Sequence, residues 1–315
     1  MRRFNHLPIS GSLIILMFWC HSHAQLSKYL SIDPFKAPFV YEDIENINRA
    51  FQMITRDSDT LKILQVEYLD KGTPGLKMFV EKYDLTAERM RRAIRKYRSK
   101  YAVLSNMPDL LAEKVDEYRE AFANLKKYIP NAVFPTTYFL VGGHRGIGSG
   151  SLEGQLMSVE KWIPPIEYDK KASLVHELVH FQQAFAVGYE KYAALFGSEK
   201  SLLGLCIREG TAEFFAHLAT GIVPKDETLA YVRKHEKRLW EWFKKEMYGR
   251  DTGEWMWSSP SDPEQPRDVG YEMGYVIVEA YFNNAEDKIK AARDILSVTD
   301  FPAFLEESGY SDRFQ

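Results

Sequence analysis

The first third of the chain alternates apolar and polar residues with the period of an α-helix. Apolar side chains recur at steps of mostly three and four residues from Leu85 to Leu104, and again from Leu111 to Leu125. That spacing places them on one face of a helix. The pattern therefore predicts that residues 26–132 are mainly amphipathic helices, with a turn at Lys71–Gly75 that separates helices without marking a domain boundary.

The period changes at residue 133. Residues 133–141 are rich in β-branched and aromatic side chains, and residues 155–160 form a second strand candidate, so the two should pair in a small sheet. The glycine-rich segment Gly142–Gly150 lies between them. Glycines at this density can cradle a phosphate where a helix opens directly after the loop. Because a strand is expected to follow, nucleotide binding is not favoured.

A helix is predicted after the second strand. Asp169 is a suitable N-cap and Gly188 a suitable end, and between them the chain contains no helix breaker. We expect one face of this helix to be an apolar stripe made of Leu174, Leu178, Phe181 and Phe185.

The same helix carries the pattern H-E-x-x-H at His176, Glu177 and His180. Four residues separate the two histidines, so both imidazoles lie on one helix face and can reach one ion. Glu177 is one step round from His176, where it can take a proton from a water in the open coordination position of the ion. This is the strongest chemical signal in the sequence.

A third metal ligand is expected on a second apolar helix, at residues 206–217. Glu209 and Glu213 introduce carboxylates into this otherwise core-like segment, and carboxylates are costly to bury unless they are paired or bound to a metal. We predict Glu209 as the third ligand, with His217 as the fallback. Glu213, four residues on, is expected to accept the second ring N–H of a ligating histidine.

These two helices resemble the gluzincin metallopeptidases, in which an H-E-x-x-H helix is followed by a helix that supplies a glutamate ligand. The stretch Arg208–Glu213 is similar to the Asn-Glu-Gly-Phe-Ala stretch of aminopeptidase-N-type enzymes and to thermolysin. A group of predicted exported zinc-dependent proteases of bacteria, related to a gliding-motility lipoprotein, also resembles this chain over roughly residues 135–285. The resemblance implies a zinc cofactor, peptide or protein substrates and a strand at 155–160 that pairs with extended substrate.

The sequence departs from those families at two points. The acid four residues after the third ligand is usually Asp in thermolysin but is Glu213 here, and the segment from His180 to Glu209 is longer than usual. Both departures concern the second helix.

The last third of the chain is predicted to be helical again. Residues 226–248 have the pattern of one long polar helix, and the Trp- and Pro-rich loop at 255–266 either roofs the cleft or packs on the surface. In the next helix Gly270 and Gly274 share a face and permit close packing. Tyr271 and Tyr275 are candidate oxyanion donors, although a core role is open for either.

Composition adds limits on the partners. The net charge of −3 offers no support for nucleic-acid binding, and the basic helix face at residues 89–100 is either a solvated face or an attraction for an anionic surface. The first 24 residues have the pattern of a secretory signal peptide cut after Ala24, although Cys20 leaves a lipid anchor as the alternative. Cys206 then remains as the one cysteine, which we expect to be a small buried residue without a disulfide.

The sequence therefore predicts a helix-rich α+β fold with a zincin-like domain, a small sheet, an H-E-x-x-H helix and a glutamate-bearing helix. We expect a signal peptide at 1–24 and a single domain at 25–315, divided into a helical part (25–132), the sheet and metal helices (133–223) and a helical cap (224–315). The expected function is exported zinc-dependent peptide hydrolysis. The alternative is an exported binding or assembly protein that retains the fold; a closed structural zinc site is less favoured because only three ligands are evident.

Overall fold

A computed structural model describes residues 30–146, 148–151, 154–163, 169–223, 225–257 and 259–314. The predicted signal peptide, with Cys20, lies outside these residues. The chain is a helix-rich α+β protein with small sheets. Within the described residues no helix is both long enough and apolar enough to cross a membrane.

The N-terminal part is helical, as the apolar period predicts, but its helices are shorter than the stripes. The expected stripe from Leu85 to Leu104 is divided because Thr86 caps a new helix and Tyr97 leaves the helical conformation. The helical elements here are η1 (Pro34–Lys36), α2 (Glu42–Met53), α3 (Thr60–Ile63), η2 (Leu64–Leu69), α4 (Pro74–Tyr83), α5 (Ala87–Lys96), α6 (Arg98–Ala102), η3 (Leu104–Asn106), α7 (Met107–Ala112) and α8 (Val115–Tyr128).

The described residues form two sheets, and the larger one lies beside the H-E-x-x-H helix. Its order is β2-β4-β6-β5, in which β2, β4 and β6 run parallel and β5 is antiparallel to β6. The smaller sheet pairs β1 with β3. The strands are β1 (Leu30–Ser31), β2 (Phe39–Val40), β3 (Phe134–Pro135), β4 (Thr137–Leu140), β5 (Gly148–Ser151) and β6 (Gly154–Ser158), and η4 (Val159–Trp162) follows β6.

The predicted pairing of the two strand segments is confirmed, because β4 and β6 are neighbours. A strand, β5, also follows the glycine-rich loop, as expected. The prediction that residues 155–160 pair with substrate is wrong. β6 is hydrogen-bonded on both sides, to β4 and to β5, so its backbone groups are already used, and β5 is the edge of this sheet.

The remaining elements are helices. They are α9 (Lys170–Val187), α10 (Tyr189–Phe196), α11 (Leu202–Thr220), α12 (Asp226–Lys234), α13 (Glu236–Glu246), α14 (Val269–Asn284), α15 (Lys288–Leu296), α16 (Phe301–Glu307) and η5 (Tyr310–Phe314). The expected single helix at 226–248 is broken at His235, because α12 packs on α14 whereas α13 buries Trp240 against Tyr310.

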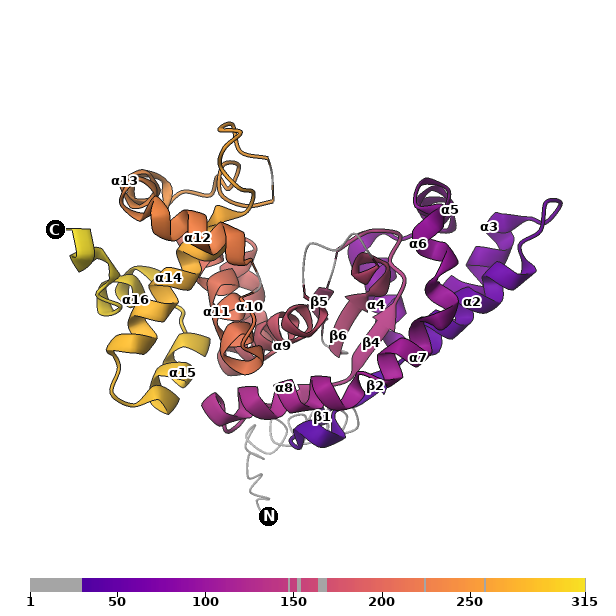
Figure 1. Cartoon of the computed structure of the whole chain (residues 1–315), viewed down its shortest axis with the longest axis horizontal. Helices are drawn as coiled ribbons and strands as arrows, with labels where there is room; N and C mark the ends of the chain where they lie inside the picture. The colour runs from indigo at the N-terminus through magenta and orange to yellow at the C-terminus, as the bar shows by residue number, and fades with distance from the viewer. Residues whose placement is uncertain are drawn as a thin grey trace, which may run out of the picture.

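Figure 1 shows α9 between the sheet on one side and α11 on the other, with α12 to α16 beyond α11. Two buried glutamines attach α9 to the sheet region. The Gln155 amide donates to the Leu174 carbonyl at 2.9 Å, and the Gln182 amide exchanges hydrogen bonds with the backbone of Val133. The buried apolar residues from Ala37 to Tyr310 form one connected cluster. The H-E-x-x-H helix is thus held from both sides.

The close packing predicted for Gly270 and Gly274 is present. A Cβ at Gly274 would overlap the Cys206 carbonyl, and a Cβ at Gly210 would overlap the backbone of Gly274. The backbones of α11 and α14 therefore touch, which only glycine allows. Cys206 is a free, fully buried thiol at this crossing, as expected for a small core residue.

Candidate metal site

Helix α9 has the caps that the sequence predicts. The Asp169 side chain accepts a hydrogen bond from the Ala172 N–H at 2.9 Å, and the helix ends at Gly188. The buried face differs from the predicted stripe. Phe185 is 56% exposed, and the buried residues of this helix are Ala172, Leu174, Val175, Leu178, Val179, Gln182 and Gln183.

Helix α11 is buried over most of its length, and this places its carboxylates in the interior. The Ser201 hydroxyl accepts from the Gly204 N–H and caps the helix. Glu209 and Glu213 are each only 3% exposed, one helical turn apart. The longer segment between His180 and Glu209 contains the additional helix α10, so it does not displace Glu209 from the two histidines.

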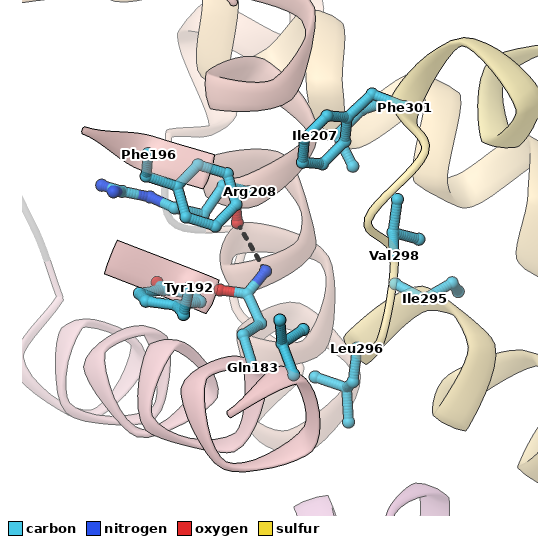
Figure 2. Close-up of a pocket in the computed structure, with 10 residues that line it drawn as sticks. Gln183, Tyr192, Phe196, Ile207, Arg208, Ile295, Leu296, Val298 and Phe301 are labelled. Atoms are coloured by element: carbon cyan, nitrogen blue, oxygen red, sulfur yellow. Dashed lines mark hydrogen bonds between the residues drawn. The ribbon is translucent and has the colours of Figure 1, made fainter. Parts of the chain in front are cut away.

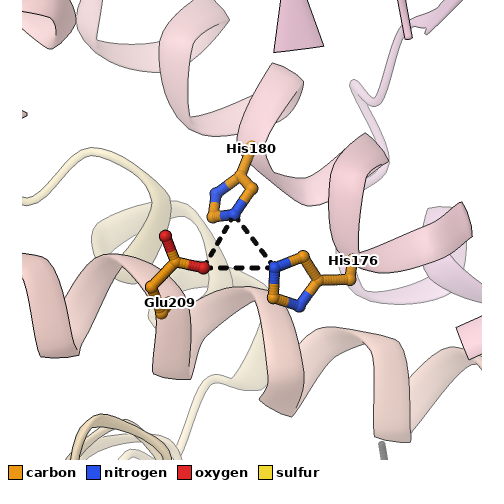
Figure 3. A group of neighbouring side chains, drawn as sticks. All are labelled: His176, His180 and Glu209. Carbon is orange, nitrogen blue, oxygen red and sulfur yellow. Dashed lines mark hydrogen bonds and ion pairs between the residues drawn. The ribbon is translucent and has the colours of Figure 1, made fainter. Parts of the chain in front are cut away.

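His176, His180 and Glu209 point toward one another (Figure 3). The His176 Nε2 and His180 Nε2 atoms are 3.0 Å apart. One carboxylate oxygen, Glu209 Oε2, lies 3.2 Å from the first and 3.1 Å from the second. These three atoms form an almost equilateral triangle of metal-ligating groups.

The opposite ring nitrogens of the two histidines each have an acceptor. His176 Nδ1 lies 3.4 Å from Glu213 Oε1, and His180 Nδ1 lies 2.9 Å from Gln183 Oε1. With the ring protons donated to these acceptors, both Nε2 lone pairs face the centre of the triangle. Two lone pairs and a carboxylate oxygen at this distance repel one another unless a cation or a proton lies between them.

The triangle also has the dimensions that a small divalent cation needs. Ligand bonds of about 2.0–2.2 Å in a tetrahedral arrangement separate the ligand atoms by roughly 3.3–3.6 Å. The observed separations of 3.0–3.2 Å are within a few tenths of an ångström of that value. The three side chains therefore fit a metal ion in both donor type and spacing.

The charge around the triangle is arranged for a cation. Burial lowers the pKa of His176, but the carboxylates of Glu213 and Glu209 more than offset this and raise it to about 10. For Glu209 burial acts in the opposite direction and raises the pKa. The Arg208 guanidinium and the two imidazoles outweigh burial and hold the pKa of Glu209 well below its usual range. A positive charge on His176 is stabilised here, and a metal cation would be stabilised by the same field.

Gln183 and Arg208 support the site from one side, and the sequence analysis missed both. The Gln183 amide donates to the Arg208 carbonyl at 3.1 Å, which joins α9 to α11 (Figure 2). The Arg208 guanidinium pairs with Glu209 Oε1 and lies over the Phe196 ring, leaving Glu209 Oε2 for the triangle. Gln183 stands three residues after His180, within reach of its ring on a helix, and that spacing was the available signal.

These two residues also line a small cavity that is partly open to solvent. Its other walls are mainly apolar side chains of α9, α10, α11, α15 and the start of α16 (Figure 2).

Glu177 lies beside the triangle with its carboxylate free. The described residues make no hydrogen bond to it, and its side chain is partly exposed. The edge strand comes very close, because a Cβ at Gly148 would overlap the Glu177 side chain. The Glu177 carboxylate is therefore not engaged by a hydrogen-bond donor of the described residues.

The two candidate tyrosines are in different positions. The Tyr271 ring stacks against the His176 ring at 6.3 Å, and its hydroxyl accepts from Trp257 Nε1 at 2.9 Å. Tyr275 is 1% exposed and its hydroxyl meets His217 Nδ1 at 2.7 Å. Only Tyr271 is in contact with a residue of the triangle, and His217, the fallback ligand, is outside it.

The Trp- and Pro-rich loop packs against the protein and also reaches the surroundings of the site. Trp255 is buried against Phe243 and donates to Glu246, whereas Trp257 is 48% exposed next to Tyr271. Packing against the protein is confirmed at Trp255, whereas a roof over the cleft stays a prediction.

Glu272, next to Tyr271, is a further acidic group in this region that the sequence analysis did not single out. It is 1% exposed, and neither carboxylate oxygen has a hydrogen-bond partner among the described residues. Burial and then the neighbouring Glu213 raise its pKa well above the usual range.

Comparison with family models, curated proteins and solved structures finds no match to this chain. The function must therefore be argued from the geometry of the site.

Proposed function

We propose that the protein is a zinc-dependent metallopeptidase that holds its ion with His176, His180 and Glu209. The observation that carries the proposal is the triangle of ligand atoms with Glu177 beside it. Two imidazoles and one carboxylate are a donor set of catalytic zinc sites, which keep a fourth position open. A purely structural zinc site usually has four protein ligands and has no use for a free carboxylate next to it.

The side chains around the ion have different roles in hydrolysis. A zinc ion at this site supplies Lewis acidity toward water and toward a peptide carbonyl. The Glu177 carboxylate accepts a proton from the attacking water, because it is adjacent to the site and is not engaged elsewhere by the described residues. Glu213 and Gln183 hold the rings of His176 and His180 in the orientation that presents Nε2.

The edge strand β5 and Tyr271 are suited to hold the substrate. β5 is the last strand of its sheet, so an extended peptide can add to it as a further strand and lie against Glu177. The Tyr271 hydroxyl accepts from Trp257, which leaves its own proton for a developing oxyanion. We favour Tyr271 over Tyr275 for this role, since Tyr275 is engaged with His217.

The test is the substitution Glu177→Gln, assayed with a broad peptide library at neutral pH. Loss of a general base should reduce hydrolysis by about 10²–10⁴-fold. Zinc content should stay at that of the wild-type protein, because Glu177 is not a ligand. Glu190→Gln, an exposed acid on α10, is the matched control and should leave both zinc and activity unchanged.

One result would replace the enzyme with the alternative function. If the wild-type protein binds zinc but cuts no peptide that Glu177→Gln does not also cut, the protein is a binding or assembly protein that retains the site.

A further inference from the structure

Lys82 reaches from the end of α4 to the edge strand. Its ammonium donates a hydrogen bond to the Ser149 hydroxyl of β5 and lies 5.7 Å from the centre of the Tyr83 ring. Ser149 is 4% exposed, so the ammonium is held against the strand that borders the site. No sequence motif pointed to this residue.

Glu177 is near the same section of β5. It touches the strand at Gly148, the residue before Ser149. Lys82 as a whole residue is exposed, but enough protein surrounds its ammonium for burial to lower its pKa, while Glu177 acts to raise it and Arg208 to lower it. Lys82 is therefore electrostatically coupled to the residues of the site.

Among the described residues, Glu177 acts on the charge of Lys82 only from beyond ion-pair distance. No described carboxylate forms an ion pair with it, whereas the Arg208 guanidinium is already paired with Glu209. A partly desolvated ammonium gains most from a carboxylate that approaches it directly. An extended peptide lying along β5 would bring its own groups to this position.

We propose that Lys82, with Ser149, binds a carboxylate of the substrate close to the scissile bond, so that the protein acts preferentially on peptides with an acidic group there. This inference rests on the proposed function and specifies its substrate class. The carboxylate belongs either to an Asp or Glu side chain or to the C-terminus of the peptide. Both sources present the same chemistry to the ammonium.

The experiment compares wild type, Lys82→Met and Lys82→Glu on matched peptides. The peptides carry Glu, Gln or Lys on either side of one scissile bond, each with a free or an amidated C-terminus. Wild type should prefer the peptides with a carboxylate. Lys82→Met should lower kcat/KM for these by about 10- to 100-fold, the range for a hydrogen bond between charged groups. The Gln peptides with an amidated end should change little.

Charge reversal and controls separate recognition from a structural role. Lys82→Glu should shift the preference to the Lys peptides, and Lys82→Arg should retain the acidic preference. Lys77→Met, which removes an exposed lysine from the same helix, should have no effect. An equal loss on acidic and neutral peptides in Lys82→Met would overturn the proposal, since it would mean that Lys82 only supports β5 or Glu177.

The peptides with free and amidated C-termini identify which carboxylate of the substrate Lys82 binds. A preference that disappears on amidation assigns the C-terminal carboxylate, and one that follows Glu against Gln assigns the side chain. Binding of the same peptides to zinc-loaded Glu177→Gln protein is measured in parallel. If no peptide is cut, the proposed function fails. The carboxylate site still stands if binding depends on both Lys82 and the peptide charge, and is overturned if it does not.

Discussion

Buried carboxylates occur in two regions of this protein, and their partners differ. In the N-terminal half, Asp43 accepts from the Thr73 N–H at 2.9 Å and from the Thr73 hydroxyl at 2.5 Å. Glu160, after β6, accepts from the His144 N–H at 2.9 Å. Both acids are fully buried, and both fix the backbone of a loop. On α11, by contrast, Glu209 and Glu213 face imidazole rings and a guanidinium.

The protonation preferences follow from the partners. Burial is the main cause that raises the pKa of Asp43, to about 6, and the same cause raises that of Glu160, because neutral donors offset it only in part. The cationic partners of Glu209 more than offset burial and lower its pKa. Burial of a carboxylate therefore does not by itself mark a functional site, whereas a carboxylate that stays ionised among imidazoles is a candidate for one.

The largest effect that tests this comparison is expected at Glu209. Glu209→Gln keeps the shape of the side chain but removes the charge that binds the ion. Zinc affinity should therefore fall by more than roughly 100-fold, the most expected when a hydrogen-bond partner of a ligand is lost. Glu213→Gln should lower it only about 10- to 100-fold, and Asp43→Asn should leave it unchanged. Competition with a chromophoric chelator measures all three.

The ranking of the two glutamates is the decisive outcome. If Glu213→Gln weakened zinc binding more than Glu209→Gln, the third ligand would lie one helical turn further along α11. If Asp43→Asn weakened it as well, the contrast between the two kinds of buried acid would be wrong.

A smaller effect, on stability, is expected at Asp43. Its folded-state pKa is raised to about 6 from 3.8, so the folded protein holds this proton more tightly than the unfolded chain does. The contribution of Asp43 to the free energy of unfolding is therefore fully present below about pH 3.8 and is lost as the pH rises toward 6. Asp43→Asn keeps an acceptor for the Thr73 N–H and removes the charge, and its amide would donate to the Thr73 hydroxyl, from which Asp43 accepts. It should raise the free energy of unfolding at pH 8 by up to about 3 kcal/mol.

Urea unfolding of the metal-free protein at pH 4 and pH 8 checks this prediction. The gain should be present at pH 8 and nearly absent at pH 4. Asp57→Asn, an exposed acid in the next loop, should change stability little at either pH. A gain at Asp43 that is equal at both pH values would show that burial of its charge is not the cause.

The sequence was most informative where a motif lies within one helix. The ends of α9, the histidines one turn apart and the glycine face of α14 all depend on helix period and capping, which are local. Glu209 and Glu213 could be predicted because an acid on an apolar helix is costly to bury without a partner. Asp43 and Glu160 could not, because nothing in an amphipathic or strand pattern shows which acid will accept hydrogen bonds from a loop.

Features that depend on tertiary packing were predicted less well. The order of strands in the sheet makes β5 the edge and β6 an inner strand, and a strand pattern does not contain that order. Phe185 has helical spacing but extends beyond the surface that covers α9, so it is exposed. The two residues of β2 are too few for a period-2 pattern and become a strand only by pairing with β4.

The smallest predicted effect concerns the two adjacent glutamines of α9. Gln183 accepts from His180 Nδ1, whereas Gln182 hydrogen-bonds the backbone of Val133. One glutamine therefore contacts the candidate site and the other holds the fold, which is the same contrast as between the two groups of buried acids. Gln183→Leu should weaken zinc binding by about tenfold, the lower end of the range for such losses, because a neutral acceptor orients the ring without adding charge. Gln183→Glu should restore or increase the affinity, since a carboxylate accepts the same proton.

Gln182→Leu should instead lower the free energy of unfolding and leave zinc affinity unchanged. Chelator competition and urea unfolding on the three variants distinguish the two roles, and a loss of zinc affinity in Gln182→Leu equal to that in Gln183→Leu would remove the distinction.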